Sequence, residues 1–212
     1  QGDEVLNSVK SRSEFIDEVD ISFPCLWYMF NNESSLKNYG TSQTSLDTKS
    51  ITYTISDENK HIPFKGSLAS AITLNKNIIE DLRNDFTISM WVKGSSSEIL
   101  KVSGSTEYIK IANSANSGTE LTTTSGGNTS SIPSIDTVNF HHIVLKCATE
   151  PDNSKVLTTY YDKDTKTTIN IDSSYIFNYS SDTILLGANV EYNDLRIFNK
   201  ALDDGKIANL YN

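Results

Sequence analysis

Two histidines are adjacent in this chain, His141 and His142, in the apolar run FHHIVLKC that ends at Cys147. Histidine is a common zinc ligand and the usual acid–base group near neutral pH. A short apolar run of this kind is typical of a β-strand. Neighbouring side chains on a strand point to opposite faces, so the two imidazoles cannot easily share one ion. The sequence therefore predicts structural histidines, one packed and hydrogen-bonded and the other on the opposite face.

Other reactive groups form no familiar catalytic motif. The sequence has no Gly-x-Ser-x-Gly elbow, no glycine-rich phosphate loop before a helix and no Cys-x-x-Cys pair. Its two cysteines, Cys25 and Cys147, each lie inside an apolar run. They could form one disulfide or remain two buried thiols, and the sequence leaves both alternatives open.

Several aromatic residues could take part in carbohydrate recognition. A sugar has an apolar C–H face that an aromatic ring matches, with polar groups at the rim. The candidates for such a surface are Trp91, Tyr108, Tyr160 and Tyr192. A tryptophan on a central strand can equally be part of the core, and loop tips on a rigid sandwich are the alternative place for recognition.

Composition narrows the class of protein. The chain has 212 residues, of which 37% are hydrophobic and 21% charged, and its net charge is −9. This length suits one all-β domain with polar loops. A surface that neutralises phosphates should be basic, so nucleic acid is not an expected partner. No run of about 18 apolar residues exists, so no membrane insertion is expected. An acidic surface leaves room for calcium.

Period-2 alternation is the main structural signal. In residues 86–93, Phe86, Ile88, Met90 and Val92 share one face, and Thr87, Ser89, Trp91 and Lys93 share the other. Gly, Ser, Asn and Asp separate such segments at intervals typical of a sandwich or barrel. Further strands are predicted at 26–30, 50–55, 66–74, 98–102, 108–112, 120–124, 140–147, 157–161, 167–171 and 194–198. The polar stretch 113–131 is predicted to be a hairpin with a mobile tip.

The two ends of the chain differ from its middle. Asp203 or Asp204 could cap a last short helix that carries Ile207, Leu210 and Tyr211. Residues 1–24 are predicted to be an N-terminal extension or linker, in part helical, and residues 25–212 the domain. Apolar residues at helical spacing within 1–22 allow a second interpretation, in which this segment drives homo-oligomerisation.

A set of motifs in a fixed order resembles the laminin-G-like, concanavalin A-like jelly-roll family. The motifs are LWYMFNNE at 26–33, FKGS at 64–67, FTISMWVKG at 86–94, FHHIVLKC at 140–147, TTYYDKD at 158–164 and EYNDLRIFNKALDDGKIANLY at 191–211. The resemblance covers residues 26–211. The chain departs from the family pattern at Phe140, where the family usually has Trp, and in lacking an Asp-Gly turn after the YYDKD strand.

This resemblance implies an all-β fold, an antiparallel two-sheet jelly-roll sandwich in which the first and last strands pair. The end of the first strand would then lie beside the start of the last. Oxygen ligands from both would converge, and a calcium ion needs six to eight of them. The implied ligand set is Asn31, Asn32, Glu191 and Asp194. The alternative is a loop of capping side chains without metal.

The family also includes glucanases, which carry Glu-x-Asp-x-x-Glu on one strand. The nearest match starts at Glu18-Val19-Asp20, has Phe23 in place of the second Glu, and precedes the first sandwich strand. We therefore expect a non-enzymatic recognition module for a glycan or cell-surface receptor, extracellular or on a virion. It would be the terminal part of a larger adhesin or fibre. The alternatives are a structural, oligomerising domain and a glycoside hydrolase or lyase.

Overall fold

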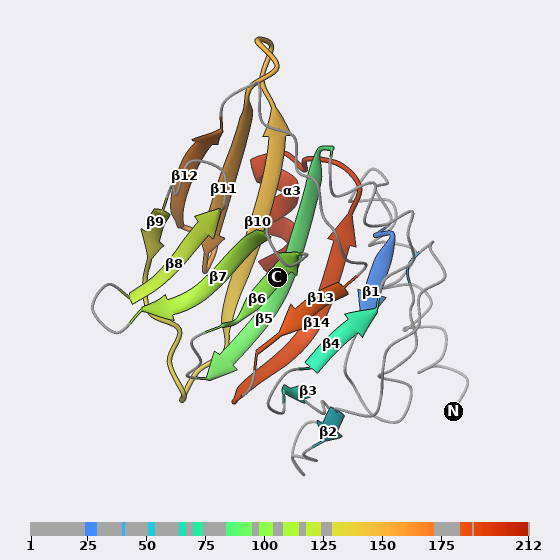
Figure 1. Cartoon of the computed structure of the whole chain (residues 1–212), viewed down its shortest axis with the longest axis vertical. Coiled ribbons are helices and arrows are strands. Elements are labelled where there is room, and N and C mark those ends of the chain that lie inside the picture. Colours follow the sequence, from blue (N-terminus) through green and yellow to red (C-terminus); the bar gives the residue numbers. More distant parts are fainter. Residues whose placement is uncertain are drawn as a thin grey trace.

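The computed structural model describes residues 24–28, 40, 51–53, 64–66, 70–73, 84–94, 98–103, 108–114, 118–123, 129–171, 183–187 and 189–211. These residues form two antiparallel β-sheets packed face to face, with one short helix against the back of the larger sheet (Figure 1). The predicted all-β sandwich is confirmed.

Within the described residues, the large sheet has eight strands and the small sheet six. In spatial order the large sheet contains β12 (Thr165–Ile171), β11 (Lys155–Tyr161), β10 (His141–Thr149), β5 (Phe86–Gly94), β14 (Val190–Phe198), β3 (Phe64–Gly66) and β2 (Ile51–Tyr53), with β1 (Leu26–Tyr28) also paired to β14. The small sheet contains β4 (Ser70–Thr73), β13 (Thr183–Leu186), β6 (Leu100–Ser103), β7 (Tyr108–Ser114), β8 (Gly118–Thr123) and β9 (Thr129–Ile132).

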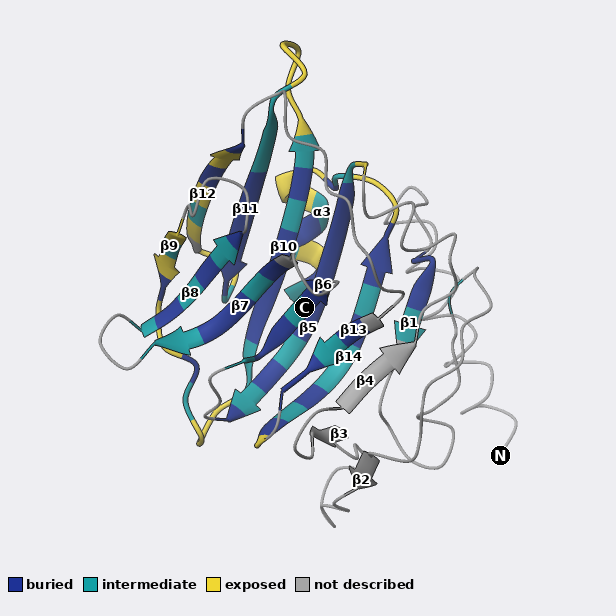
Figure 2. Ribbon diagram, viewed as in Figure 1, coloured by how far each residue is buried: buried dark blue, intermediate teal, exposed yellow. Residues whose placement is uncertain are grey.

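The main core lies between the sheets, and β5 shows how the sequence builds it. Phe86, Ile88, Met90 and Val92 are buried in this core, as the alternation of residues 86–93 predicts. The opposite side of the same strand forms part of the outer face of the large sheet. Figure 2 shows that the central strands β5, β10 and β7 are largely buried, whereas β9, β12 and the turn between β10 and β11 carry exposed residues.

Helix α3 (Asp204–Tyr211) covers a second, smaller core on that outer face. Asp203 caps the helix, because its Oδ1 accepts the backbone N–H of Lys206 at 2.8 Å. The apolar side of the helix then packs on the sheet. This second cluster consists of Val144, Tyr160, Phe198, Leu202, Ile207 and Leu210. The predicted C-terminal helix is confirmed.

The first and last strands pair antiparallel, as expected. Leu26 lies opposite Ile197 and Trp27 opposite Arg196. The backbone N–H of Cys25 extends the pairing by donating to the carbonyl of Ile197 at 2.7 Å. A β-bulge between Asn193 and Arg196 interrupts the ladder with β5, and Asp194 there has a φ of 50°.

Strands β8 and β9 pair antiparallel, so the hairpin predicted within 113–131 is confirmed, and its tip at 124–128 lies outside the described residues. Two segments differ from expectation. The predicted strand at 66–74 is instead divided between β3 and β4, which belong to different sheets. The hairpin of β11 and β12 closes without an Asp-Gly turn, because Asp162 and Lys163 themselves adopt φ values of 46° and 70°.

Both cysteines are buried thiols and not a disulfide. The thiol of Cys25 donates to the carbonyl oxygen of Ile197 at 3.1 Å. Burial raises the pKa of Cys147 to about 12. Residues 1–23, and with them the predicted extension and its oligomerising role, lie outside the described residues. Within the described part of the chain, no helix is long and apolar enough to cross a membrane.

Candidate functional site

The predicted aromatic candidates do not form one surface. Tyr192 is 0% exposed and Tyr160 is 4% exposed. Tyr108 lies on β7 of the small sheet, and its side chain is outside the described set. Trp91 is half-buried on the outer face of the large sheet. Among the three candidates whose side chains are described, only Trp91 is placed where a ligand could reach its ring.

Tyr192 belongs to the main core. Its hydroxyl donates to the carbonyl of Ile99 at 2.5 Å and accepts the N–H of Gly187 at 2.7 Å. Burial raises its pKa far above the usual value. The prediction that Tyr192 stacks on a sugar is therefore wrong. Alternation with Val190, which lies two residues earlier on the same face, is the signal that could have shown this.

Tyr160 belongs to the second core, under helix α3. Its hydroxyl donates to Asp204 Oδ1 at 2.7 Å, and Lys146 and Lys166 also contact the carboxylate of Asp204. Burial, followed by the hydrogen bond to Asp204, raises the pKa of Tyr160. The ring therefore anchors the helix to the sheet. The prediction that Tyr160 contacts a ligand is wrong for this reason.

Trp91 is part of an aromatic group on the outer face. Its ring centroid lies 5.0 Å from that of His142 and 5.2 Å from that of Tyr211. Tyr211 is the last residue of helix α3 and is half-buried. The helical spacing predicts Tyr211 on the packed side of the helix, and no sequence pattern links it to Trp91. Only the docking of the helix brings the two rings together.

His142 lies beneath these rings. It is 2% exposed, and its Nε2 lies 2.8 Å from the hydroxyl of Ser89, which is also 2% exposed. Burial lowers the pKa of His142 to about 4. The spacing resembles that of a nucleophile and its base, but a substrate cannot reach either atom. The contact is a buried structural hydrogen bond, which agrees with the predicted packing of one histidine.

The two described members of the predicted calcium set are engaged elsewhere. Asp194 Oδ1 accepts the indole N–H of Trp27 at 2.7 Å, and its carboxylate also binds the guanidinium of Arg196 at 2.9 and 2.5 Å. Glu191 pairs with Lys93 at 2.9 Å. Asn31 and Asn32 lie outside the described residues.

Glu191 and Asp194 are each paired with a cationic side chain, so a calcium ion there would compete with Lys93 and Arg196 for their carboxylate oxygens. Because Asn31 and Asn32 are not described, the calcium site stays a prediction. The described residues also contain no group of three or more His, Cys, Asp or Glu side chains that could hold a metal. The start of β14 lies beside β3, where Glu191 is opposite Lys65.

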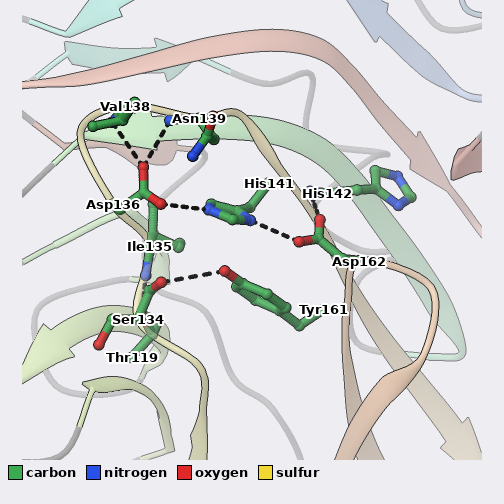
Figure 3. A network of polar contacts seen from close by, with 10 residues as sticks. All are labelled: Thr119, Ser134, Ile135, Asp136, Val138, Asn139, His141, His142, Tyr161 and Asp162. Carbon is green, nitrogen blue, oxygen red and sulfur yellow. Dashed lines mark hydrogen bonds and ion pairs between the residues drawn. The ribbon is translucent and has the colours of Figure 1, made fainter.

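A second polar centre lies at one end of the sandwich, where the loop between β9 and β10 meets the turn between β11 and β12 (Figure 3). His141 connects the two. Its Nδ1 lies 2.6 Å from Asp162 Oδ2, and its Nε2 lies 3.0 Å from Asp136 Oδ2. Its ring also stacks on Tyr161, with centroids 4.9 Å apart. The opposite faces predicted for His141 and His142 are confirmed.

The loop from 133 to 140 is fixed at several further points. Asp136 Oδ1 accepts the backbone N–H groups of Val138 and Asn139, both at 2.7 Å. The carbonyl of Asp136 accepts the N–H of Gly94 at 2.7 Å. The hydroxyl of Tyr161 donates to the carbonyl of Ser134 at 3.2 Å. These contacts hold Val138, which is 77% exposed, at a defined position on the loop.

These contacts shift the pKa values of Asp136, His141 and Tyr161. The backbone N–H of Asn139, the side chain of His141 and the N–H of Val138 hold the pKa of Asp136 well below its usual value. Burial lowers the pKa of His141, but the hydrogen bonds and charges of Asp162 and Asp136 outweigh it, so the net shift is upward. Burial raises the pKa of Tyr161 to about 12. The sequence signal for Asp136 was its position at the start of a polar turn.

Comparison with known proteins adds information on the fold. No family model matches the chain, and no curated protein matches it. A solved receptor-binding domain aligns with 93% of this chain at 19% identity and a TM-score of 0.65. The receptor-binding domain of botulinum neurotoxin type G aligns with 89% of this chain at 13% identity and a TM-score of 0.63.

A further match is the binding domain of botulinum neurotoxin DC in complex with rat synaptotagmin II, which covers 89% of this chain at 18% identity and a TM-score of 0.58. At these identities the likeness concerns the fold alone. The alignments cover 52%, 51% and 51% of the three solved chains, so this chain spans about half the length of each.

Proposed function

We propose that this chain is a non-catalytic recognition module that binds a glycan or a cell-surface receptor, outside the cell or on a virion. Support comes from the fold, which it shares with half of several receptor-binding domains. The binding domain of botulinum neurotoxin DC, which shares this fold, was solved in complex with rat synaptotagmin II and, in another structure, with SialylT. Those ligands belong to the neighbours, and the site on this chain has to be argued from its own residues.

The observation that carries the proposal is the pair of half-buried rings, Trp91 and Tyr211, on the outer face of the large sheet. Their centroids lie 5.2 Å apart. Asn193 lies opposite Trp91 in the ladder, so its amide borders the same face. Rings next to an amide can offer a sugar both an apolar contact and a hydrogen-bonding group.

A glycan array tests this proposal. We expect the full chain to bind a subset of glycans, and Trp91→Ala to weaken that binding by roughly tenfold or more, because truncation of a central aromatic contact typically costs about 1.4 kcal/mol or more. The matched control is Trp27→Ala, which removes the chain's other tryptophan, the one engaged by Asp194 and Arg196.

The outcomes separate the alternatives. Equal losses in the two variants would argue against the Trp91 surface and for a general loss of stability, which the unfolding midpoint of each variant would show. If no glycan binds, pull-down of labelled cell-surface proteins tests the receptor half of the proposal. A failure of both assays would favour the structural, oligomerising alternative.

Calcium dependence, which the family resemblance implies, is tested by Asp194→Ala. The contacts of Asp194 with Trp27 and Arg196 predict a loss of about 1.5–3 kcal/mol in the free energy of unfolding, of equal size in calcium and in chelator. Thermal unfolding in each buffer measures it. A clearly larger loss in calcium would instead support the metal site. The control is Asp152→Ala, which removes an exposed carboxylate in another turn.

A further inference from the structure

His141 joins two loops through both of its ring nitrogens. Nδ1 contacts Asp162, in the turn between β11 and β12, and Nε2 contacts Asp136, in the loop between β9 and β10. The two carboxylates therefore lie on opposite edges of one imidazole (Figure 3). Because both loops contact this one ring, its protonation state decides whether both contacts can be hydrogen bonds.

Both carboxylates are held as hydrogen-bond acceptors. Asp136 Oδ1 accepts two backbone N–H groups, those of Val138 and Asn139. Asp162 Oδ1 accepts the backbone N–H of His142 at 2.8 Å. An ionised carboxylate has no proton to donate, and a neutral imidazole has only one N–H. Both contacts of His141 can be hydrogen bonds only if the ring is a doubly protonated imidazolium.

We propose that His141 is a proton-operated latch, whose imidazolium holds the loop 133–140 against the turn between β11 and β12. When the ring loses a proton, one of the two contacts must break. The Nδ1 contact with Asp162 is the shorter one, so the neutral ring keeps its proton there. A lone pair on Nε2 then faces the carboxylate oxygen of Asp136, which repels it and loosens the tip of the loop.

The charged groups around His141 come from each neighbouring element. The loop supplies Asp136 and the turn supplies Asp162. Strand β11 supplies Tyr161, which stays neutral well above neutral pH because its pKa is about 12. On β5 the residue opposite His141 is the apolar Val92, and the neighbouring Lys93 is paired with Glu191. The balance at the ring is therefore set by two negative charges.

The direction of the pH effect follows from this balance. The pKa of His141 is raised above its ordinary 6.5, because the two carboxylates outweigh burial. The latch is therefore fully closed below pH 6.5, and its contribution is lost as pH rises through the raised pKa of the folded state. Mild acid keeps the loop in place and alkaline pH releases it.

The neighbouring His142 has the opposite effect on the pH dependence of stability. Its pKa is lowered to about 4 by burial, so protonation of the unfolded chain between pH 6.5 and about 4 lowers global stability. The pH dependence of global unfolding would report the combined effects of His141 and His142. The experiment therefore needs a readout confined to the loop.

We would titrate the His141 ring by NMR and measure amide hydrogen-exchange protection factors at Val138 and Asn139 from pH 5.5 to 9. We expect His141 to titrate above 6.5 and the two protection factors to fall roughly tenfold across that titration, which corresponds to about 1.4 kcal/mol. Protection that stays constant while His141 titrates, or a His141 pKa at or below 6.5, would overturn the latch.

Two variants and one control complete the test. Asp136→Asn keeps an oxygen for the backbone N–H groups of Val138 and Asn139 but removes the charge, so the pKa of His141 should fall. Asp152→Asn makes the same change in a turn where Oδ1 accepts the N–H of Ser154, and should leave His141 unchanged. His141→Gln should show low protection at every pH. If it does not fold, Asp136→Asn carries the test.

The latch is independent of the proposed function, because its readouts involve no ligand. A chain that binds no glycan could still show the titration and the change in protection. Conversely, loss of the latch in Asp136→Asn would leave the Trp91 surface available for the array.

Discussion

Replacement of Gly94 by alanine is expected to lower the free energy of unfolding by about 4 kcal/mol or more, at the upper end of single-residue effects. Gly94 has a φ of +148°, which side chains rarely adopt. An added Cβ would lie 2.3 Å from the carbonyl oxygen of Asn189 and 2.8 Å from Cα of Val190. Val190 is paired with Gly94 in the ladder, so the backbone cannot easily move away.

Urea unfolding of Gly94→Ala measures this loss, and Gly205→Ala is the matched control. Gly205 lies in the first turn of helix α3, where the nearest atom to an added Cβ is the side-chain Oδ1 of Asp203 at 3.4 Å. Alanine there should be neutral or should stabilise the protein by up to about 1 kcal/mol. Similar losses at the two positions would contradict the geometry at Gly94.

Leu26→Ala is expected to cost about 2–5 kcal/mol, the usual range for a buried leucine. Leu26 is 0% exposed in the main core and lies opposite Ile197 on β14. The loss comes from the cavity that the shortened side chain leaves between β1 and the rest of the core. For a chain of this size, a change of about 3 kcal/mol shifts the thermal midpoint by roughly 6–12 °C.

Val138→Ala is the control for Leu26→Ala. It also shortens an aliphatic side chain, but Val138 is 77% exposed, so its effect should stay within about 0.5 kcal/mol. Calorimetry on the three proteins would compare them directly. A Leu26 variant as stable as the Val138 variant would mean that β1 contributes little to closing the sandwich.

Much of the fold was predictable because its signals are local. The alternation of Phe86, Ile88, Met90 and Val92 identifies the inner face of β5, and all four lie in the main core. Asp203 or Asp204 before Ile207 and Leu210 predicts a capped helix, and in the structure the cap is Asp203. The sequence predicts the hairpin within 113–131 but not the bounds of its second strand, because Thr129–Ile132 is short and polar and gives a weak strand signal.

The candidate site was predictable only in part. Period-2 alternation correctly put His141 and His142 on opposite faces of β10. Tyr160 and Tyr192 were assigned to a ligand surface because aromatic type alone does not tell a buried ring from an exposed one. Tyr160 is covered by helix α3, which follows it by more than forty residues in the chain. The sequence around Tyr160 therefore does not indicate that its ring is buried.

What the sequence by itself determined is therefore the class of fold, the core face of β5, the pairing of the first and last strands and the capped helix. The class of fold, the core face of β5 and the capped helix follow from periodicity and turn chemistry, and the pairing of the first and last strands is what the resemblance to the jelly-roll family implies. The tertiary structure alone decided that Trp91 meets Tyr211, and that His141 lies between Asp136 and Asp162. These contacts join side chains from separate segments, so they exist only once the sheets and loops are assembled.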